Sequence, residues 1–273
     1  MNDNRIQKQF TRTKTQQKTA LILYLTAGFP DIGATEELIP ALVEAGADGI
    51  EIGVPFSDPL ADGATIQASS FTALQQGITL KDCLELVGRV RHKVPNTPII
   101  LMGYYNPIFN VGLESFCAMA KKSTVDGLII PDLPVEESNP LLEQCNSFGI
   151  DLIPLLAPTS TDERIGKICA VASGFIYCVS VTGVTGARTE IGPEVPQLVK
   201  RIRSWTNLPI GVGFGISTPQ HMKAIGQVAD AGIVGSALIR IIKDSPRRDL
   251  IARASTFVDK IRRTTQLTVE EAY

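Results

Sequence analysis

The sequence predicts an α/β fold of the (β/α)8 TIM-barrel type, in which a single domain spans residues 1–273. Eight short apolar runs alternate with amphipathic stretches of helical length, the order expected for strands joined by helical crossovers. The runs are almost continuously apolar, which is typical of parallel strands that are covered on both faces. The length also suits such a barrel, since these domains commonly reach roughly 250 residues.

The predicted elements follow in order along the chain. The strands occupy the apolar runs at 21–28, 49–54, 98–105, 127–132, 150–158, 174–181, 209–215 and 231–236. The helices between them lie at 35–46, 64–74, 79–94, 113–123, 137–149, 162–174, 194–205 and 218–228. An extra helix is expected near the N-terminus, and a 3.6-residue pattern predicts a closing helix within 246–263. Pro40 should kink its helix, and Pro140 should lie at a helix start.

An open, doubly wound sheet is the alternative fold for this alternation of strands and helices. Its dinucleotide-binding form needs the spacing G-x-G-x-x-G between a strand and a helix. The stretch "GVGFG" at 211–215 does not open a helix with that spacing. The closed barrel is therefore the favoured prediction.

The composition argues against two classes of partner. The formal net charge is -2 and no Lys/Arg run could follow a phosphate backbone, so no nucleic-acid partner is expected. No apolar stretch reaches the ~18 residues that span a bilayer, so no membrane partner is expected either. The N-terminus lacks the apolar core of a secretion signal, which favours the cytoplasm. Its basic, acid-poor character also allows an organelle, such as the plastid stroma of a photosynthetic eukaryote.

The chain lacks the residues that several kinds of catalytic centre require, and these kinds are not expected. Its five cysteines are widely spaced without a C-x-x-C pair, and we expect them to be reduced thiols. The only histidines are His92 and His221, so no metal site is expected and a metal-dependent aldolase would lack its ligands. A Schiff-base aldolase would need a lysine near a strand end, where none is predicted. Carboxylates acting without a cofactor on a phosphorylated substrate remain.

Glycine-rich turns follow the last three predicted strands, where barrels often bind phosphate. They are "TGVTGAR" (182–188), "GFG" (213–215) and "GSA" (235–237). Backbone N–H groups at glycines and at a helix N-terminus attract anions. We therefore predict a phosphate site formed by Gly186, Gly213, Gly215, Gly235 and Ser236. The alternative is that these glycines only permit tight turns and close packing.

Glu51 is the first candidate for acid–base chemistry, because it interrupts an apolar strand. Alternation along the strand directs Ile50 and Ile52 to the surrounding helices and Glu51 into the barrel mouth. Burial disfavours the charged form, which should raise the pKa of Glu51 towards the range useful for catalysis. The alternative is a structural carboxylate satisfied by backbone donors or an arginine.

Two aspartates follow in the next loop. Asp62 is the second catalytic candidate, with the N-cap of helix 64–74 as its alternative role. Asp58 stands in the tripeptide "SDP" and is more typical of a turn residue, unless this loop meets a partner.

Several specific motifs occur in the order of a known family. They include "YLTAGFPD", "GADGIEIGVPFSDPLADG", "GYYNPIF", "VDGLIIPDLP", "GFIYCVSVTGVTGAR", "GVGFGIS" and "GSALIRII", spread from about residue 10 to about residue 270. Together they resemble the tryptophan synthase α-subunit family, and "GVPFSDPLADG" is highly specific. The resemblance implies a barrel that cleaves indole-3-glycerol phosphate to indole and glyceraldehyde 3-phosphate by a retro-aldol step without a cofactor.

The resemblance also implies roles for single residues. Glu51 would protonate indole C3 and help to deprotonate the glycerol hydroxyl, and Asp62 would accept a hydrogen bond from the indole N–H. Thr185 would close over the substrate and contact Asp62, and Tyr177 would lie beside the catalytic acid. The indole slot would be walled by Tyr24, Tyr104, Ile129, Phe214 and Val234, and phosphate would bind at Gly186, Gly215, Gly235 and Ser236.

The family's usual partner is a pyridoxal-phosphate β subunit, which receives indole within an α2β2 assembly. The resemblance implies that pyridoxal phosphate belongs to that partner and that this chain binds no cofactor. The docking side would carry Asp58, Asn106, Pro107 and Pro134. Ala64 and the run 69–74 depart from the family pattern, which affects the helix after the second strand.

Three other functions remain open from the sequence. The chain could be a stand-alone lyase that releases free indole, or a non-catalytic subunit that only docks on and activates its partner. It could also be another phosphate-binding barrel, such as a phosphosugar isomerase.

Overall fold

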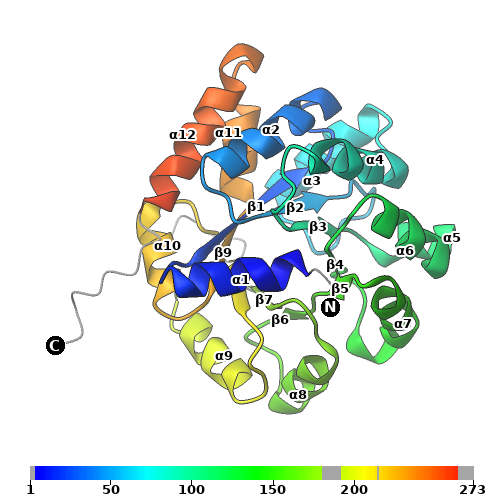
Figure 1. Ribbon diagram of the computed structural model, residues 1–273, viewed down its shortest axis with the longest axis vertical. Coiled ribbons are helices and arrows are strands. Elements are labelled where there is room, and N and C mark those ends of the chain that lie inside the picture. Colours follow the sequence, from blue (N-terminus) through cyan, green and yellow to red (C-terminus); the bar gives the residue numbers. More distant parts are fainter. Residues whose placement is uncertain (1–3, 180–191, 214, 264–273) are drawn as a thin grey trace.

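A ring of parallel strands lies at the centre of the structure, with helices around its outside (Figure 1). In this computed structural model, residues 4–179, 192–213 and 215–263 are described. The strands follow one another in the order β5-β4-β3-β2-β1-β9-β8-β7-β6. They are β1 (Ala20–Thr26), β2 (Gly49–Gly53), β3 (Ile99–Met102), β4 (Gly127–Ile129), β5 (Asp151–Leu152), β6 (Leu155–Leu156), β7 (Ile176–Val179), β8 (Ile210–Gly213) and β9 (Ala231–Val234). The predicted α/β barrel is confirmed.

One extended segment, 151–156, closes the barrel with two short strands. Its first half, β5, pairs with β4, and its second half, β6, pairs with β7. The prediction of a single strand over 150–158 is therefore wrong. The reason is Pro154, which has no N–H to donate and still accepts a 3.0 Å hydrogen bond from the Tyr177 N–H through its carbonyl.

The predicted helices between the strands are present with some shifted ends, and the helix at Tyr105–Val111 was not predicted. The helices are α1 (Arg5–Thr15), α2 (Ile32–Glu44), α3 (Ala64–Gln75), α4 (Leu80–Arg91), α5 (Tyr105–Val111), α6 (Leu113–Lys122), α7 (Asn139–Phe148), α8 (Asp162–Val171), α9 (Glu194–Arg203), α10 (Pro219–Gly226), α11 (Ser236–Lys243) and α12 (Leu250–Arg262), with short 3-10 turns η1 (Val135–Glu137) and η2 (Arg247–Asp249).

The extra helix α1 and the closing helix α12 confirm two further predictions, and α12 lies beside α2 (Figure 1). Pro140 falls in the first turn of α7, as predicted, and Pro40 lies inside α2. The third strand ends earlier than predicted, because Tyr105 already begins α5.

Alternation along the strands divides the core into two layers. Inward side chains such as Ile22, Ile100, Phe175 and Ile233 form a cluster inside the barrel. Outward side chains pack against the helices, and they include Ile50 and Ile52 as predicted. Glu51, between those two, therefore points inward.

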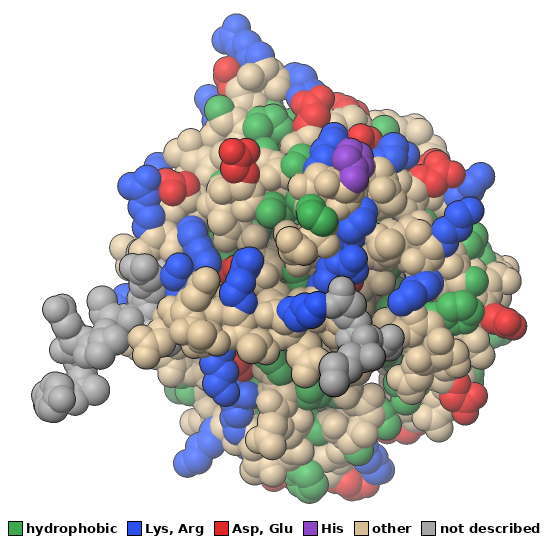
Figure 2. Space-filling view, viewed as in Figure 1, with side chains coloured by type: hydrophobic (Ala, Val, Ile, Leu, Met, Phe, Trp, Pro, Cys, Tyr) green, Lys and Arg blue, Asp and Glu red, His purple; other side chains and the backbone are tan. Residues whose placement is uncertain are grey.

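Helix α1 crosses the barrel at the end where the strands begin (Figure 1). Its apolar residues Ile6 and Phe10 join the inward cluster, and the Phe10 ring lies 5.5 Å from the Phe175 ring between centroids. On this face Lys and Arg side chains gather over the helix, while most acidic side chains lie nearer the rim (Figure 2). The helix thus covers the end of the barrel opposite to the predicted active site.

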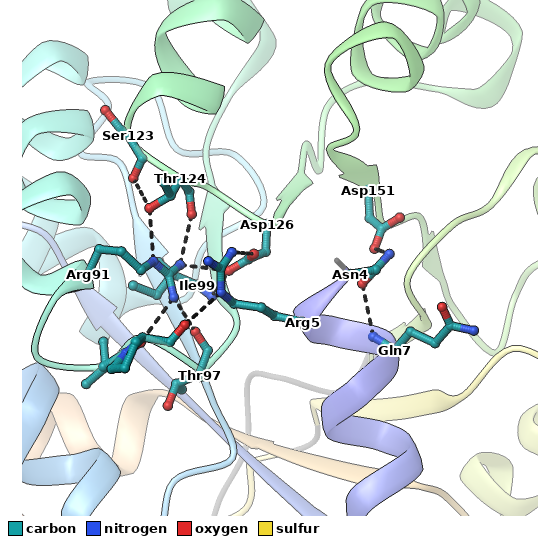
Figure 3. A network of polar contacts seen from close by, with 12 residues as sticks. Asn4, Arg5, Gln7, Arg91, Thr97, Ile99, Ser123, Thr124, Asp126 and Asp151 are labelled. Atoms are coloured by element: carbon teal, nitrogen blue, oxygen red, sulfur yellow. Dashed lines mark hydrogen bonds and ion pairs between the residues drawn. The ribbon is translucent and has the colours of Figure 1, made fainter. Parts of the chain in front are cut away.

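Asp126 is the centre of a polar network that holds α1 in place (Figure 3). Its carboxylate accepts hydrogen bonds from the Arg5 Nη1 at 2.9 Å, the Arg91 Nη2 at 2.8 Å and the Ile99 backbone N–H at 2.8 Å. Arg91 also donates to the Thr124 side chain and carbonyl. The network joins α1 and α4 to the starts of β3 and β4.

Asp48 has the same role at the start of β2. Its carboxylate accepts hydrogen bonds from the Gln9 amide at 2.6 Å, the Leu21 N–H at 3.0 Å and the Arg262 Nη1 at 2.7 Å. The first and last helices are thereby joined to the same buried carboxylate.

Replacing Asp126 tests how much the network stabilises the fold. We expect Asp126→Ala to lower the free energy of unfolding by about 3–5 kcal/mol, because it leaves the mostly buried Arg91 guanidinium without its counter-ion. Urea unfolding of the full chain measures this, and Asp126→Asn should lose less because it keeps acceptor oxygen.

Glu163→Ala is the matched control, because it removes only an exposed ion pair with Lys167. The control should leave the unfolding midpoint unchanged within error. Equal effects of Asp126→Ala and Glu163→Ala would contradict the role of the network.

Candidate active site

Glu51 lies inside the barrel wall on β2, with 1% of its surface exposed. In the sheet register it stands between Tyr24 of β1 and Ile100 of β3. Neither carboxylate oxygen has a hydrogen-bond partner among the described residues. The alternative of a structural carboxylate paired with backbone donors or an arginine is not supported within this part of the chain.

The surroundings of Glu51 favour its protonated form. Burial, and to a smaller extent the nearby negative charge of Asp62, together raise the pKa of Glu51 to about 8. A carboxyl group with this pKa carries a proton at neutral pH and can deliver it to a substrate atom.

Asp62 lies in the loop between β2 and α3, close enough to Glu51 for the two charges to interact. Burial raises the pKa of Asp62 to about 6, and a hydrogen bond from Tyr104 opposes that rise. The adjacent Ala61 N–H donates to the Tyr104 hydroxyl at 3.0 Å, which ties the loop to the end of β3. Asp62 therefore remains largely ionised at neutral pH while Glu51 is protonated.

Asp62 is not the N-cap of the following helix. Gly63 occupies that position without a side-chain hydrogen bond, and the Asp62 carbonyl accepts from the Gln67 side chain at 2.7 Å. The capping alternative is therefore wrong, and the Asp62 carboxyl group is left for other contacts.

Tyr24 and Tyr177 are buried beside Glu51. Burial raises the pKa of both hydroxyls, and the charges of Asp62 and Glu51 act on each in the same direction. A Cβ atom at Gly53 would come within 2.0 Å of the Tyr24 hydroxyl, and one at Gly213 within 2.5 Å of the Tyr177 hydroxyl. These two glycines make room for the rings, a packing role that the sequence did not assign to Gly53.

A short chain of hydroxyl groups leads from the site to α3. The Thr26 hydroxyl donates to the Tyr24 hydroxyl at 3.4 Å and lies 2.6 Å from the Ser69 hydroxyl, and all three side chains are buried. Neither Thr26 nor Ser69 was among the site residues predicted from the sequence. Thr26 could have been found, because it follows Tyr24 by two residues and so shares its face of β1.

The apolar wall contains most of the described residues that were predicted for it. Tyr104 is buried and stacks on Phe56 with ring centroids 4.9 Å apart. Ile129 belongs to the inward cluster together with Tyr177. Phe214 and Thr185 lie outside the described residues.

Val234 does not face the inside of the barrel. On β9, Ala231 and Ile233 belong to the inward cluster, whereas Gly232 faces Met222 of α10 and Val234 packs in the outer layer. The prediction for Val234 is wrong by one position, because side chains on a strand alternate. Ile233 is the inward residue at this point.

The predicted phosphate residues lie after the last two strands. Gly213 ends β8, Gly215 has a positive φ of 59°, Gly235 is the N-cap of α11 and Ser236 begins that helix. The structure therefore brings β8 and β9 turns to the same end of the barrel as Glu51. Gly186 lies outside the described residues.

The predicted docking residues also lie at this end. Asp58 is exposed in the loop after β2, Asn106 and Pro107 stand in the first turn of α5, and Pro134 is exposed just before η1. Leu60, in the loop after β2, is 94% exposed, and Phe109, in α5, is 61% exposed. Large exposed apolar side chains of this kind are typical of a protein contact surface.

Two negative findings apply to residues 4–179, 192–213 and 215–263. No group of three or more His, Cys, Asp or Glu side chains there is arranged to hold a metal ion. No helix of that part combines the length and apolar character of a membrane span.

A (β/α)8 barrel with two carboxyl groups of different pKa at the carboxyl ends of its strands defines a barrel enzyme of the acid–base class. The chain belongs to the tryptophan synthase alpha chain family, whose sequence pattern matches residues 10–267. The family resemblance of the motifs is thus confirmed.

Relatives of this chain are similar over almost its full length. The tryptophan synthase alpha chains of Roseiflexus sp. (strain RS-1) and Chloroflexus aurantiacus are 49% and 46% identical to it. These matches cover 95% and 94% of this chain and 99% and 97% of the relatives.

Solved structures agree with the fold. A Mycobacterium tuberculosis tryptophan synthase structure has a TM-score of 0.90 at 34% identity, covering 97% of this chain and 99% of that chain. The tryptophan synthase alpha chain of Legionella pneumophila subsp. pneumophila has a TM-score of 0.89 at 34% identity, covering 98% and 99%.

Because Glu51 is buried, we expect the variant Glu51→Gln to become more stable relative to the wild type as the pH rises. Folding raises the pKa of Glu51 from 4.5 to about 8. Between these pH values the carboxyl group is ionised in the unfolded chain but protonated in the folded one, so the stability of the wild type falls as the pH rises from about 4.5 to about 8. At about 1.4 kcal/mol per pH unit, the difference between variant and wild type should grow by up to about 5 kcal/mol over this range.

Urea unfolding between pH 4 and pH 9 measures this difference. Glu143→Gln, which changes an exposed carboxylate on α7, is the control and should follow the wild type at every pH. A constant difference between Glu51→Gln and wild type across the range would contradict the raised pKa.

Proposed function

We propose that this chain cleaves indole-3-glycerol phosphate to indole and glyceraldehyde 3-phosphate. The observation that carries the proposal is the pair Glu51 and Asp62, one protonated and the other ionised at neutral pH in the same enclosed space. Membership of the tryptophan synthase alpha chain family gives the substrate and products.

Glu51 supplies the proton transfers of the retro-aldol step. Its protonated carboxyl group donates a proton to indole C3, which makes the ring electron-deficient. The resulting carboxylate then helps to remove the proton of the neighbouring glycerol hydroxyl, the C–C bond breaks and its electrons return to the ring. Indole leaves with the proton from Glu51, and the hydroxyl carbon becomes the aldehyde of glyceraldehyde 3-phosphate.

Asp62 orients and stabilises the ring during this step. Its carboxylate accepts a hydrogen bond from the indole N–H, and this contact strengthens as positive charge develops on the ring. The Tyr104 hydroxyl, which binds the loop at Ala61, keeps Asp62 in position.

The remaining site residues bind the two ends of the substrate. Tyr24, Tyr104, Ile129, Tyr177, Ile233 and Phe214 enclose the apolar ring, and Thr185 closes over it. The phosphate binds to backbone N–H groups at Gly186, Gly213, Gly215, Gly235 and Ser236, where the N-terminus of α11 favours an anion.

The proposed partner is a tryptophan synthase β subunit, which takes up the indole. The solved Mycobacterium tuberculosis relative is a tryptophan synthase, and the exposed Leu60 and Phe109 stand beside the predicted docking residues Asp58, Asn106, Pro107 and Pro134. We propose an α2β2 assembly in the cytoplasm. The reaction of this chain requires no cofactor, and pyridoxal phosphate belongs to the partner.

Indole release from indole-3-glycerol phosphate tests the two catalytic assignments. We expect Glu51→Gln to lower kcat by about 10²-fold or more, because the proton donor is lost. Asp62→Asn should lower kcat by about 10²-fold, because a neutral amide cannot stabilise the positive ring. Glu143→Gln is the control and should keep wild-type turnover.

The same assay with and without a β subunit separates the alternative functions. Turnover that rises on adding the β subunit supports the proposed partnership, and high turnover without it indicates a stand-alone lyase. Activation of the β subunit without any cleavage would instead identify a non-catalytic docking subunit.

The pKa values predict a bell-shaped pH profile for kcat/KM. Activity should rise through pH 6 as Asp62 ionises and fall through pH 8 as Glu51 loses the proton it must donate. Steady-state assays from pH 5 to pH 9.5 measure both limbs. Asp62→Asn should lose the acidic limb, and an unchanged acidic limb in that variant would exclude Asp62 as its source.

A further inference from the structure

A cavity of about 410 Å³ lies where the barrel wall separates between β4 and β6. Pairing of β4 with β5 ends where the Ile153 N–H donates to the Leu128 carbonyl at 2.8 Å. Beyond that point, β6 pairs with β7 only, among the described strands. The cavity occupies this gap and extends outward to α8, and its volume lies within the roughly 300 to 1,000 Å³ typical of small-molecule sites.

The cavity is separate from the space beside Glu51 but shares a wall with it. Neither Glu51 nor Tyr104 lines it, and several of its lining residues belong to the outer layer. Leu155 also lines it, packs with the inward cluster and stands opposite Tyr177 in the register. Ile153 lines the cavity as well and is a buried member of the same cluster, so two side chains contact both the cavity and the interior of the barrel.

Most of the cavity wall is apolar. The segment after β4, the split strand and α8 contribute Ile130, Leu133, Leu152, Leu155, Ile168 and Val171.

The polar side chains in the wall are already engaged by the protein. Ser138 donates to the Val135 carbonyl at 2.8 Å, and the Arg164 Nη1 is paired with Glu136 at 3.0 Å. Asp132 accepts from the Tyr105 N–H through Oδ1 and keeps a second carboxylate oxygen. An anionic ligand would have to compete with Glu136, whereas a neutral apolar ligand leaves these pairs intact.

We propose that this cavity is a second binding site for a neutral, planar bicyclic aromatic molecule, namely indole. Its apolar wall removes the ring from water, and the second carboxylate oxygen of Asp132, for which the described residues provide no hydrogen bond, can accept the one N–H that indole donates. The choice of ligand rests on the proposed function, in which indole is formed on the other side of Leu155. The site would retain indole next to the catalytic centre.

Methyl NMR of the full chain, labelled at Ile, Leu and Val, locates indole directly. Added indole should shift the methyl signals of Ile168 and Val171, which line the cavity, in a saturable way. Ala172→Leu adds a larger side chain to the cavity wall and should weaken this binding by about tenfold or more. Ala170→Leu is the matched control, because Ala170 is exposed on the same helix, and it should titrate like the wild type.

Three outcomes would overturn the proposal. The first is that Ile168 and Val171 stay unshifted at indole concentrations that shift Ile129 inside the barrel. The second is that Ala172→Leu titrates like the wild type. The third is that only indole-3-carboxylate shifts Ile168 and Val171, which would identify an anion site at Arg164.

The cleavage assay distinguishes this failure from failure of the proposed function. Normal cleavage with unshifted cavity signals removes only the second site. Absence of cleavage with saturable shifts at Ile168 and Val171 removes the proposed reaction and leaves the cavity as an indole site.

Discussion

Closure of the parallel sheet into a ring decides where the side chains of its strands can lie. Once the strands form a ring, every second side chain must enter a small interior, and the others must pack against helices. Ile22, Ile100 and Phe175 fill that interior with apolar atoms. Glu51 occupies an equivalent inward position, and its raised pKa follows from the same enclosure that stabilises the fold.

The carboxylates at the two ends of the barrel differ in whether they have hydrogen-bond partners. At the end where the strands begin, Asp126 and Asp48 each accept several hydrogen bonds and each faces an arginine. At the other end, Glu51 is as deeply buried as Asp48 and more deeply than Asp126, and it has no partner among the described residues. Because the fold satisfies comparable groups elsewhere, the lack of a partner is a local property of this site. It is the arrangement expected of a group kept for proton transfer.

Pro154 links the closure of the barrel to its second cavity. The residue splits one strand position into β5 and β6, so that the segment pairs first with β4 and then with β7. Beyond the split, β6 pairs with β7 and not with β4 among the described strands, and the cavity lies there. The continuous segment 151–156 thus bridges β4 and β7, while the cavity occupies the gap in the wall beside Leu155.

Local patterns in the sequence are enough to specify the order of strands and helices, the two faces of each strand and the inward position of Glu51, because apolar periodicity is a local property. The family resemblance of the motifs also named Asp62, Tyr104, Ile129 and Tyr177 as candidate site residues. Tertiary contacts were needed to establish that Gly63 caps α3, that Ile233 and not Val234 faces inward, and that Pro154 divides a strand. The tertiary structure also decided the contacts of Arg5 with Asp126, 121 residues apart. Such contacts depend on which ends of distant segments meet when the sheet closes, and local patterns do not contain that information.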